Sequence, residues 1–339
     1  MPVDVKLFDE LEAAARDAGA VLTRERQPSP YDNVDWLRLT RDHVLGAVPL
    51  VAARARNATA EAWLFLAERD RGRAEPYGSW YTLRFAPVFG GERRPDLVEA
   101  IGGELRRKMS ALLLYPLDEE DSALIGEAFG RSGWISDKEV TSVNWVADTD
   151  GLDFDAYWAR RPSRLRNTAK RKAAKAKLSI EIFDGFEASA WDAYEAVYRV
   201  SWKPEEGSPA FVRAFAEQAG SWGTLRLGVA RKPDGKPVAA QLWTVDGDVA
   251  TIHKLSYAEA EKANSPGTIL SEAMFRHVIE RDRPRLIDFG TGDDGYKADW
   301  MDRKRPLYRL GLYNRRSLTG VGLAARARLA ALVAKRRSR

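Results

Sequence analysis

Two tight-turn sequences divide residues 224–257, TLRLGVARKPDGKPVAAQLWTVDGDVATIHKLSY, into three apolar segments. The turns are Pro-Asp-Gly at 233–235 and Asp-Gly at 246–247. Asp-Gly between alternating apolar residues is the strongest short-range signal for a β-hairpin. The pattern therefore predicts a three-stranded antiparallel meander, and no other segment constrains the fold of this chain as tightly.

The rest of the chain alternates between strand and helix patterns. Strands are predicted at 62–70, 79–89, 110–117, 142–147, 178–183 and 285–290. Helices are predicted at 6–19, 95–108, 122–131, 188–199 and 209–220, and another begins after Ser265-Pro266-Gly267. This order indicates an α/β fold with a mixed (α+β) sheet. There is no exact repeat, but two similar halves of about 150 residues each suggest a duplicated architecture.

The composition excludes several classes of protein. The chain has 339 residues, 45% of them apolar, and no cysteine, which excludes disulfides and thiolate catalysis. No apolar run reaches the length of a membrane span, and the acidic first residues do not resemble a signal peptide. We therefore expect a cytoplasmic location, with no metal cofactor.

The net charge of +5 conceals two basic strips. Residues 160–177 contain nine basic residues and no acid, and residues 303–339 contain twelve basic residues and no acid. The remaining residues together carry −16. Such strips suit phosphates, anionic lipid head groups or nucleic acid. We therefore predict four segments: an N-terminal domain at 1–154, a basic linking helix at 155–177, a C-terminal domain at 178–314 and a basic amphipathic tail at 315–339.

The stretch EKANSPGTILSEAM (261–274) leads from a polar loop into a helix. Gly267 allows close approach to the backbone, Pro266 suits a first helical turn, and Ser265 or Thr268 can cap the helix. Free N–H groups at a helix N-terminus also bind phosphate. Taken alone, the stretch is interpreted as a cap or as a phosphate cradle.

The order of meander, loop, helix and strand resembles the acyl-CoA-dependent N-acyltransferases of the GNAT superfamily. Their pyrophosphate loop has the signature Q/R-x-x-G-x-G/A, to which Lys262, Ser265 and Gly267 correspond, with Lys262 and Ser265 departing from the usual residues. RNTAKRK (166–172) and DFGTGDDGYKADW (288–300) resemble the branch called cellulose-biosynthesis-type acetyltransferases, which is related to the Fem-type aminoacyl transferases. The resemblance covers about residues 31–313.

This resemblance implies two GNAT-like halves, with the acyl-CoA site in the second. Acyl transfer to an amine needs a base, oxyanion stabilisation and an acid for the departing thiolate. His253, on a strand face with Thr251, Leu255 and Tyr257, or Asp288, at a strand end, is the candidate base; packing and turn capping are the alternatives. By resemblance, Tyr296 protonates the thiolate and Lys297 stabilises the oxyanion or binds phosphate. The cofactor-binding candidates are Lys262, Ser265, Pro266, Gly267 and Thr268.

Further residues are candidates for substrate binding. Arg166, Asn167 and Lys170 lie on the basic helix and can bind phosphate of the acceptor or of CoA; a solvated face is the alternative. Gln241 and Trp243 line a pocket or pack in the core. The tail at 317–339 resembles a basic amphipathic helix on an anionic membrane, or it docks on the protein.

The leading hypothesis is an acyl-CoA-dependent N-acyltransferase acting on an envelope-related amine, peripheral to the inner membrane if the tail binds lipid. The acceptor is a long-chain amino alcohol, as in bacterial ceramide synthases, or an amino sugar of a surface polysaccharide. A second hypothesis is a Fem-type transferase using aminoacyl-tRNA, although no long coiled-coil arm is predicted and nucleic-acid binding is not favoured. A third is a degenerate GNAT-fold binding module.

Overall fold

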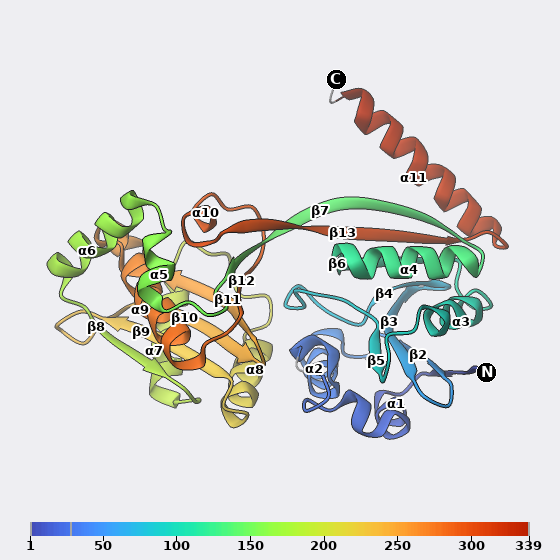
Figure 1. Ribbon diagram of the computed structural model, residues 1–339, viewed down its shortest axis with the longest axis horizontal. Helices are drawn as coiled ribbons and strands as arrows, with labels where there is room; N and C mark the ends of the chain where they lie inside the picture. The colour runs from blue at the N-terminus through green and yellow to red at the C-terminus, as the bar shows by residue number, and fades with distance from the viewer. Residues whose placement is uncertain (1, 28, 338–339) are drawn as a thin grey trace. The chain divides into compact units, whose positions relative to one another are not determined.

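A computed structural model describes residues 2–27 and 29–337 of the chain, which divides into two compact units (Figure 1). The first unit comprises Met1–Val143 and Pro306–Arg339, and the second comprises Asn144–Arg305. The chain passes between them inside two strands, β7 (Trp134–Asp148) and β13 (Arg303–Asn314). The basic helix lies within the second unit, so strands rather than this helix connect the halves. Ser338 and Arg339 of the predicted tail lie outside the described residues.

The first unit is a sheet with helices on both faces. Its strand order is β1-β2-β3-β4-β6-β13-β7, with β5 beside β3, and only β4 and β6 pair in parallel among the registers described. Its remaining elements are β1 (Asp4–Phe8), β2 (Leu50–Arg56), β3 (Glu61–Asp70), β4 (Arg73–Pro76), β5 (Val88–Gly90), β6 (Ala111–Leu117), α1 (Leu11–Ala18), α2 (Val34–Thr40), α3 (Pro95–Leu105), α4 (Glu119–Arg131) and α11 (Leu318–Arg337), with short turns η1 (Gly19–Leu22), η2 (Pro30–Asp32) and η3 (Arg41–Leu45).

Strand β3 separates two hydrophobic cores, because successive side chains of a strand point to opposite faces. Trp63 and Phe65 pack in the core that contains α1 and α2. Leu64 and Leu66 pack in the core that contains α3 and α4. The run AWLFLA is apolar throughout because both faces of the strand are covered.

The second unit contains the meander. Its strand order is β7-β12-β11-β10-β9-β8, and only β11 and β12 pair in parallel. Its other elements are α5 (Phe154–Ala159), α6 (Ser163–Ala176), β8 (Ser179–Phe183), α7 (Ala188–Arg199), α8 (Pro209–Ser221), β9 (Leu225–Arg231), β10 (Pro237–Asp246), β11 (Val249–Tyr257), η4 (Glu259–Asn264), α9 (Pro266–His277), η5 (Val278–Asp282), β12 (Leu286–Thr291) and α10 (Lys297–Trp300).

Helix α9 packs on one face of this sheet through Phe275. Its ring stacks on Tyr157 and Trp300, with centroids 5.2 and 4.9 Å away, and meets Trp243 edge-on at 5.0 Å. Gln241 and Trp243 of β10 face α9, whereas Thr244 and His253 face α8 on the other side. The two faces of the sheet therefore carry different groups of helices.

The expected α/β class with a mixed sheet is confirmed, and two local predictions were wrong. Residues 6–8 belong to β1, which pairs with β2, so the helix begins only at Leu11. Residues 79–82 form a turn in which the Thr82 amide donates to the Ser79 carbonyl and the Ser79 amide donates to Thr82 Oγ1, so the strand is confined to β5. Across the described ranges, no helix combines the length and the apolar content needed to cross a membrane.

Candidate functional site

Strands β11 and β12 part from one another in the middle of the second unit. Their parallel ladder joins Val249–Thr251 to Leu286–Asp288, and no pair continues it, although β11 runs on to Tyr257 and β12 to Thr291. Two parallel strands that separate leave space and free backbone groups between them. The loops at this end of the strands surround a cavity.

This cavity, here called the α9 cavity, has a volume of about 500 Å³. Its lining combines apolar and aromatic residues with the loop that opens α9. The lining residues are Leu165, Trp202, Leu255, Tyr257, Lys262, Ser265, Pro266, Gly267, Thr268, Ser271, Asp294, Tyr296, Asp299 and Trp300. All five predicted cofactor-binding residues are therefore together in one cavity.

The first turn of α9 lines this cavity, and its amides lack the carbonyl acceptors that the helix supplies to later residues. Ser265 has a left-handed backbone with φ 54°, and Pro266 occupies the first helical position. The amides of Gly267 and Thr268 have no helical carbonyl four residues earlier, as in any first turn. A side chain on Gly267 would meet Tyr257, whose Cδ1 lies 3.0 Å from an ideal Cβ. Glycine thus keeps this turn open, and the turn can hold an anion.

Gln241 and Trp243 support this turn from beneath. Both are fully buried. Gln241 Nε2 donates to Ser271 Oγ at 2.8 Å and more weakly to the Gly267 carbonyl at 3.4 Å, and its Oε1 accepts from Trp243 Nε1 at 2.9 Å. Neither residue lines the α9 cavity, so their contacts fix the position of α9 on the sheet.

Tyr296 and Lys297 are adjacent in sequence but occupy different environments. Tyr296 lines the cavity, and burial together with the charge of Asp294 raises the pKa of its phenol to about 12. Lys297 is buried and donates from Nζ to the Thr291 carbonyl at 2.7 Å, with Asp294 Oδ2 at 3.5 Å. Burial lowers the pKa of Lys297. Lys297 therefore stabilises the loop after β12, and Tyr296 projects from it.

Asp288 lies at the last residue pair before β11 and β12 separate. Its Oδ1 accepts from the Gly290 amide at 2.7 Å, and its Oδ2 accepts from Asn144 Nδ2 at 2.7 Å and from Arg305 at 3.1 Å. Burial raises the pKa of this carboxyl, while the Gly290 amide and Arg305 oppose the rise. Asp288 thus caps the glycine-rich turn, and it does not line the α9 cavity.

His253 lies on the sheet face opposite to Leu255 and Tyr257, two of the residues with which strand alternation had grouped it. The register of β10 and β11 shifts between Leu242 and Trp243, so His253 is the extra residue of a β-bulge. Its Nε2 lies 3.0 Å from Thr244 Oγ1, and Phe215 of α8 meets its ring edge-on. Burial lowers the pKa of His253 to about 3, so it is neutral. The bulge separates it from Leu255 and Tyr257, which line the α9 cavity.

The basic helix α6 packs beside α9 and contributes to the cavity. Leu165 lines the cavity, Arg164 pairs with the cavity residue Asp299 at 2.6 Å, and Lys172 donates to the Ala263 carbonyl. The predicted Arg166, Asn167 and Lys170 are exposed. Arg166 and Lys170 lie about 200° and 240° around the helix from Arg164, so they lie on a different side, whereas Asn167 lies only about 60° from Arg164.

Several cavity residues were not singled out from the sequence. Trp202 stacks obliquely on Tyr257 with ring centroids 4.3 Å apart, and Asp294 and Asp299 belong to a loop and a short helix after β12. Asp294 and Asp299 fall within the DFGTGDDGYKADW motif, which marked the segment. Trp202 follows α7 in an irregular loop and carried no such signal. None of the described His, Asp and Glu side chains gather in threes as a metal site.

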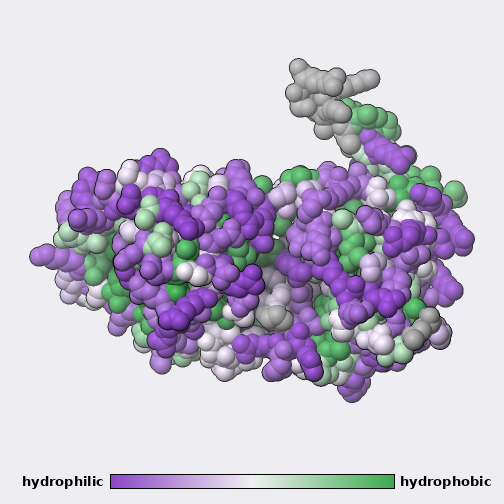
Figure 2. Space-filling model, in the orientation of Figure 1, coloured by the Kyte–Doolittle hydropathy of each residue, from purple (hydrophilic) through white to green (hydrophobic). Residues whose placement is uncertain are grey.

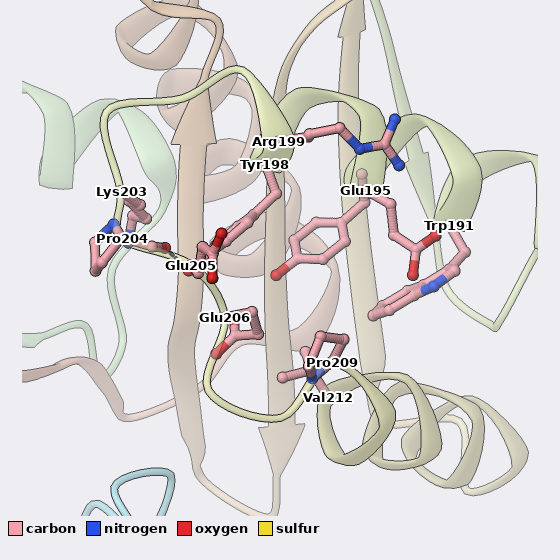
Figure 3. Close-up of a pocket in the computed structure, with 11 residues that line it drawn as sticks. Trp191, Glu195, Tyr198, Arg199, Lys203, Pro204, Glu205, Glu206, Pro209 and Val212 are labelled. Atoms are coloured by element: carbon pink, nitrogen blue, oxygen red, sulfur yellow. Dashed lines mark hydrogen bonds between the residues drawn. The ribbon is translucent and has the colours of Figure 1, made fainter.

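A second cavity of about 440 Å³, here called the α7 cavity, lies between α7, the loop at 200–208 and α8 (Figure 3). Lys203 lines this cavity, whereas the preceding residue, Trp202, lines the α9 cavity. Burial and the neighbouring charge of Lys254 lower the pKa of Lys203 to about 8. A single loop therefore contributes to both cavities.

Comparison with known proteins places the second unit in a described class of domain. Residues 159–298 match the family model described as an acetyltransferase (GNAT) domain. The search of curated proteins found no match. The match supports an acetyltransferase-type enzyme. Its boundaries enclose α6, the α7 cavity, the Tyr296-Lys297 pair and all of the α9 cavity except Asp299 and Trp300.

Solved structures share the fold over nearly the whole chain. The C-terminal domain of a putative lysylphosphatidylglycerol synthetase from Agrobacterium fabrum has a TM-score of 0.58 at 16% identity and covers 96% of each chain. FemX has a TM-score of 0.56 at 10% identity, covering 81% of this chain and 94% of its own. A tandem GNAT protein from the clavulanic acid biosynthesis pathway has a TM-score of 0.50 at 13% identity, covering 91% and 98%. The chain thus has a GNAT fold.

Titration of Lys203 makes the free energy of unfolding depend on pH between about 8 and 10.5. Its folded pKa is about 8 against an ordinary 10.5, so between these values the unfolded chain binds one more proton. The free energy of unfolding therefore rises with pH there, by up to about 1.4 kcal/mol per unit. Lys203→Met should remove this rise in urea unfolding measured from pH 7.5 to 10.5. The exposed Lys236→Met is the control, and equal slopes in both variants contradict the prediction.

Proposed function

We propose that the protein is an acyl-CoA-dependent N-acyltransferase that acts on a primary amine. The observation that carries this proposal is the first turn of α9, whose free N–H groups face the α9 cavity where β11 and β12 part. A pyrophosphate fits such a turn through hydrogen bonds and the helix dipole. Ser265, Pro266, Gly267 and Thr268 form this cradle in the proposal.

Basic side chains around the cradle would bind further phosphate. Lys262 lines the cavity with an exposed ammonium that pairs with Glu259 at 3.0 Å. Arg171 and Lys175 are exposed on α6 and share the side of Arg164, because seven and eleven residues correspond to about two and three turns. Within α6 we therefore assign phosphate binding first to Arg171 and Lys175, with Asn167 beside them. Arg166 and Lys170 would bind phosphate only in a longer acceptor.

The proposed reaction exchanges a C–S bond for a C–N bond. The neutral amine attacks the thioester carbonyl, the carbon–sulfur bond breaks, and the thiolate takes a proton from the Tyr296 hydroxyl. Tyr296 is placed for this role because it lines the α9 cavity and, like any tyrosine, is protonated at neutral pH. Of the two candidate bases we favour Asp288 over His253, because burial raises the pKa of Asp288 and lowers that of His253. Asp288 would receive the amine proton through water.

Three readings of function remain open to experiment. The acceptor is a long-chain amino alcohol or an amino sugar, which would assign the chain to the ceramide-synthase-like or cellulose-biosynthesis-type branch. A transferase using aminoacyl-tRNA is the alternative enzyme, and the basic side of α6 would then bind RNA. A binding module without catalysis is the third, and it would retain the α9 cavity without turnover.

Gly267→Trp tests the cradle. The indole would fill the first turn of α9, and we expect binding of CoA to weaken at least tenfold in isothermal titration, which corresponds to about 1.4 kcal/mol. Gly103→Trp in α3 is the matched control, because an added side chain there meets nothing within 4 Å. Unchanged CoA affinity in Gly267→Trp contradicts the cradle. Absent CoA affinity combined with tight tRNA binding favours the aminoacyl-tRNA alternative.

Tyr296→Phe tests the proposed acid. Loss of the proton donor should lower kcat about 10²-fold or more and leave the KM for acyl-CoA nearly unchanged. Released CoA can be followed with a thiol reagent without background, because the chain contains no cysteine. The acceptors are a C12 2-amino alcohol and glucosamine. Tyr115→Phe, in the first unit, is the control, and full kcat in Tyr296→Phe excludes the role.

We further propose peripheral membrane contact through α11. Its exposed apolar side chains are Leu318, Val321, Leu329, Leu332 and Val333. Figure 2 shows apolar and charged residues side by side on this helix. By helical spacing, Arg326 and Arg328 lie directly beside the arc of these apolar side chains rather than on the opposite face. The helix is therefore less amphipathic than its sequence suggested. Exposed leucines with neighbouring arginines still favour an anionic surface.

Vesicle sedimentation tests this contact. We expect the chain to pellet with vesicles containing 30 mol% phosphatidylglycerol, at roughly ten times the fraction seen with neutral phosphatidylcholine vesicles. Replacing Leu329 and Leu332 together by Ser should abolish the difference. Replacing the exposed Val140 by Ser is the control. Equal pelleting with both vesicle types contradicts an electrostatic membrane contact.

A further inference from the structure

The α7 cavity has a lining unlike that of the α9 cavity. Its residues are Trp191, Tyr194, Glu195, Tyr198, Arg199, Lys203, Pro204, Glu205, Glu206, Pro209 and Val212. Helix α7 supplies one wall, the beginning of α8 another, and the loop between them the third (Figure 3). The walls are mainly aromatic and aliphatic, and the polar groups among them are mostly carboxylates.

Two of the three carboxylates in this lining make no ion pair with another described residue. Glu206 pairs with Lys254 at 2.5 Å, so its charge is matched. Glu195 and Glu205 have no hydrogen-bond or ion-pair partner among the described residues. In Figure 3 the Glu195 side chain points down into the space between α7 and α8, whereas the Arg199 guanidinium points away from Glu205. Glu195 and Glu205 can therefore pair with a cationic ligand, although Arg199 and Lys203 place two positively charged side chains in the same lining.

The aromatic residues of the walls favour the same kind of ligand. An ammonium is attracted to the faces of Trp and Tyr rings as well as to carboxylates. The pKa of Tyr198 is raised to about 12 by burial and by Glu206, so its ring stays neutral at physiological pH. Trp191, fully buried in the wall, has an indole N–H with no hydrogen-bond partner. An unpaired buried N–H is costly, and an oxygen of a ligand or a rearranged Glu195 would satisfy it.

The position of the cavity relates it to acyl transfer. Trp202 lines the α9 cavity and Lys203 lines the α7 cavity, so one peptide bond separates the two walls. The charges of Lys297 and Asp294, which lie on either side of Tyr296 in the sequence, also affect the pKa of Lys203. A ligand in the α7 cavity therefore lies one loop away from the donor proposed for the α9 cavity.

We propose that the α7 cavity is the acceptor-binding site and that it selects an amphipathic primary amine, with Glu195 and Glu205 pairing with its ammonium. This inference rests on the proposed N-acyltransferase function and names its acceptor class. Six of the eleven lining residues are aromatic, proline or aliphatic. Such walls suit an alkyl chain, whose burial is favourable, more than a sugar, which has no alkyl chain to cover them. A long-chain amino alcohol fits and an amino sugar does not.

Direct binding of the acceptor, in the absence of CoA, tests the site. The probe is 2-aminododecan-1-ol below its aggregation concentration, measured by isothermal titration at pH 7 against 1,2-dodecanediol and glucosamine. We expect the amine to bind at least tenfold more tightly than the uncharged diol, and glucosamine to show no binding. Comparable affinity for the amine and the diol, or tighter binding of glucosamine, overturns the proposal.

Charge-removing variants locate the binding. Glu195→Gln with Glu205→Gln keeps the size of both side chains, and we expect at least a tenfold loss of amine affinity with no change for the diol. Glu10→Gln with Glu127→Gln, two exposed acids of the first unit, is the matched control. Thermal unfolding of each variant verifies the fold. An amine affinity that is unchanged in the Glu195 and Glu205 double variant overturns the assignment.

Measuring CoA and amine binding separately distinguishes this inference from the proposed function. Loss of amine affinity in the double variant with intact CoA binding supports both proposals. CoA binding without amine binding overturns the acceptor site alone and leaves the transferase standing. Amine binding that depends on Glu195 and Glu205, in a protein without CoA affinity, supports the cation site and overturns the acyl-CoA function.

Discussion

The packing of α9 on β10 determines the geometry of everything around the α9 cavity. Phe275 lies between Tyr157, Trp300 and Trp243, and rings of this size in close contact dominate the burial of a small core. Gln241 adds hydrogen bonds to Ser271 and to the Gly267 carbonyl. A shift of α9 would therefore break apolar and polar contacts together, so the first turn is held rigidly where an anion can meet it.

The sequence predicted the elements with strong local signals and missed those decided by distant contacts. The Asp-Gly turns located the meander, and the residues at 262–268 that we propose to bind the cofactor lie together in one cavity. His253 was assigned to the face of Leu255 and Tyr257 because strand alternation was assumed. A bulge breaks that alternation, and nothing in TIHKLSY marks it. Trp202 and the α7 cavity depend on how a loop without a motif folds back.

The bulge also clarifies how one sheet serves two cavities. An extra residue in β11 puts Lys254 on the same face as His253, toward α7 and α8, and returns Leu255 and Tyr257 to the face of α9. Lys254 thereby reaches Glu206 and neutralises one acid of the α7 cavity. A regular strand would leave that acid unpaired. β-Bulges commonly re-aim side chains near functional sites in this way.

The discontinuous first unit affects the order in which the chain can fold during synthesis. Strand β6 lies between β4 and β13, and residues 111–117 emerge from the ribosome almost two hundred residues before their partner at 308–313. Until then, β6 presents an open edge, and exposed edges pair with other chains. The complete second unit can form in that interval, because domains generally fold as units while the chain is made. The end of the chain, rather than its beginning, therefore closes the first sheet.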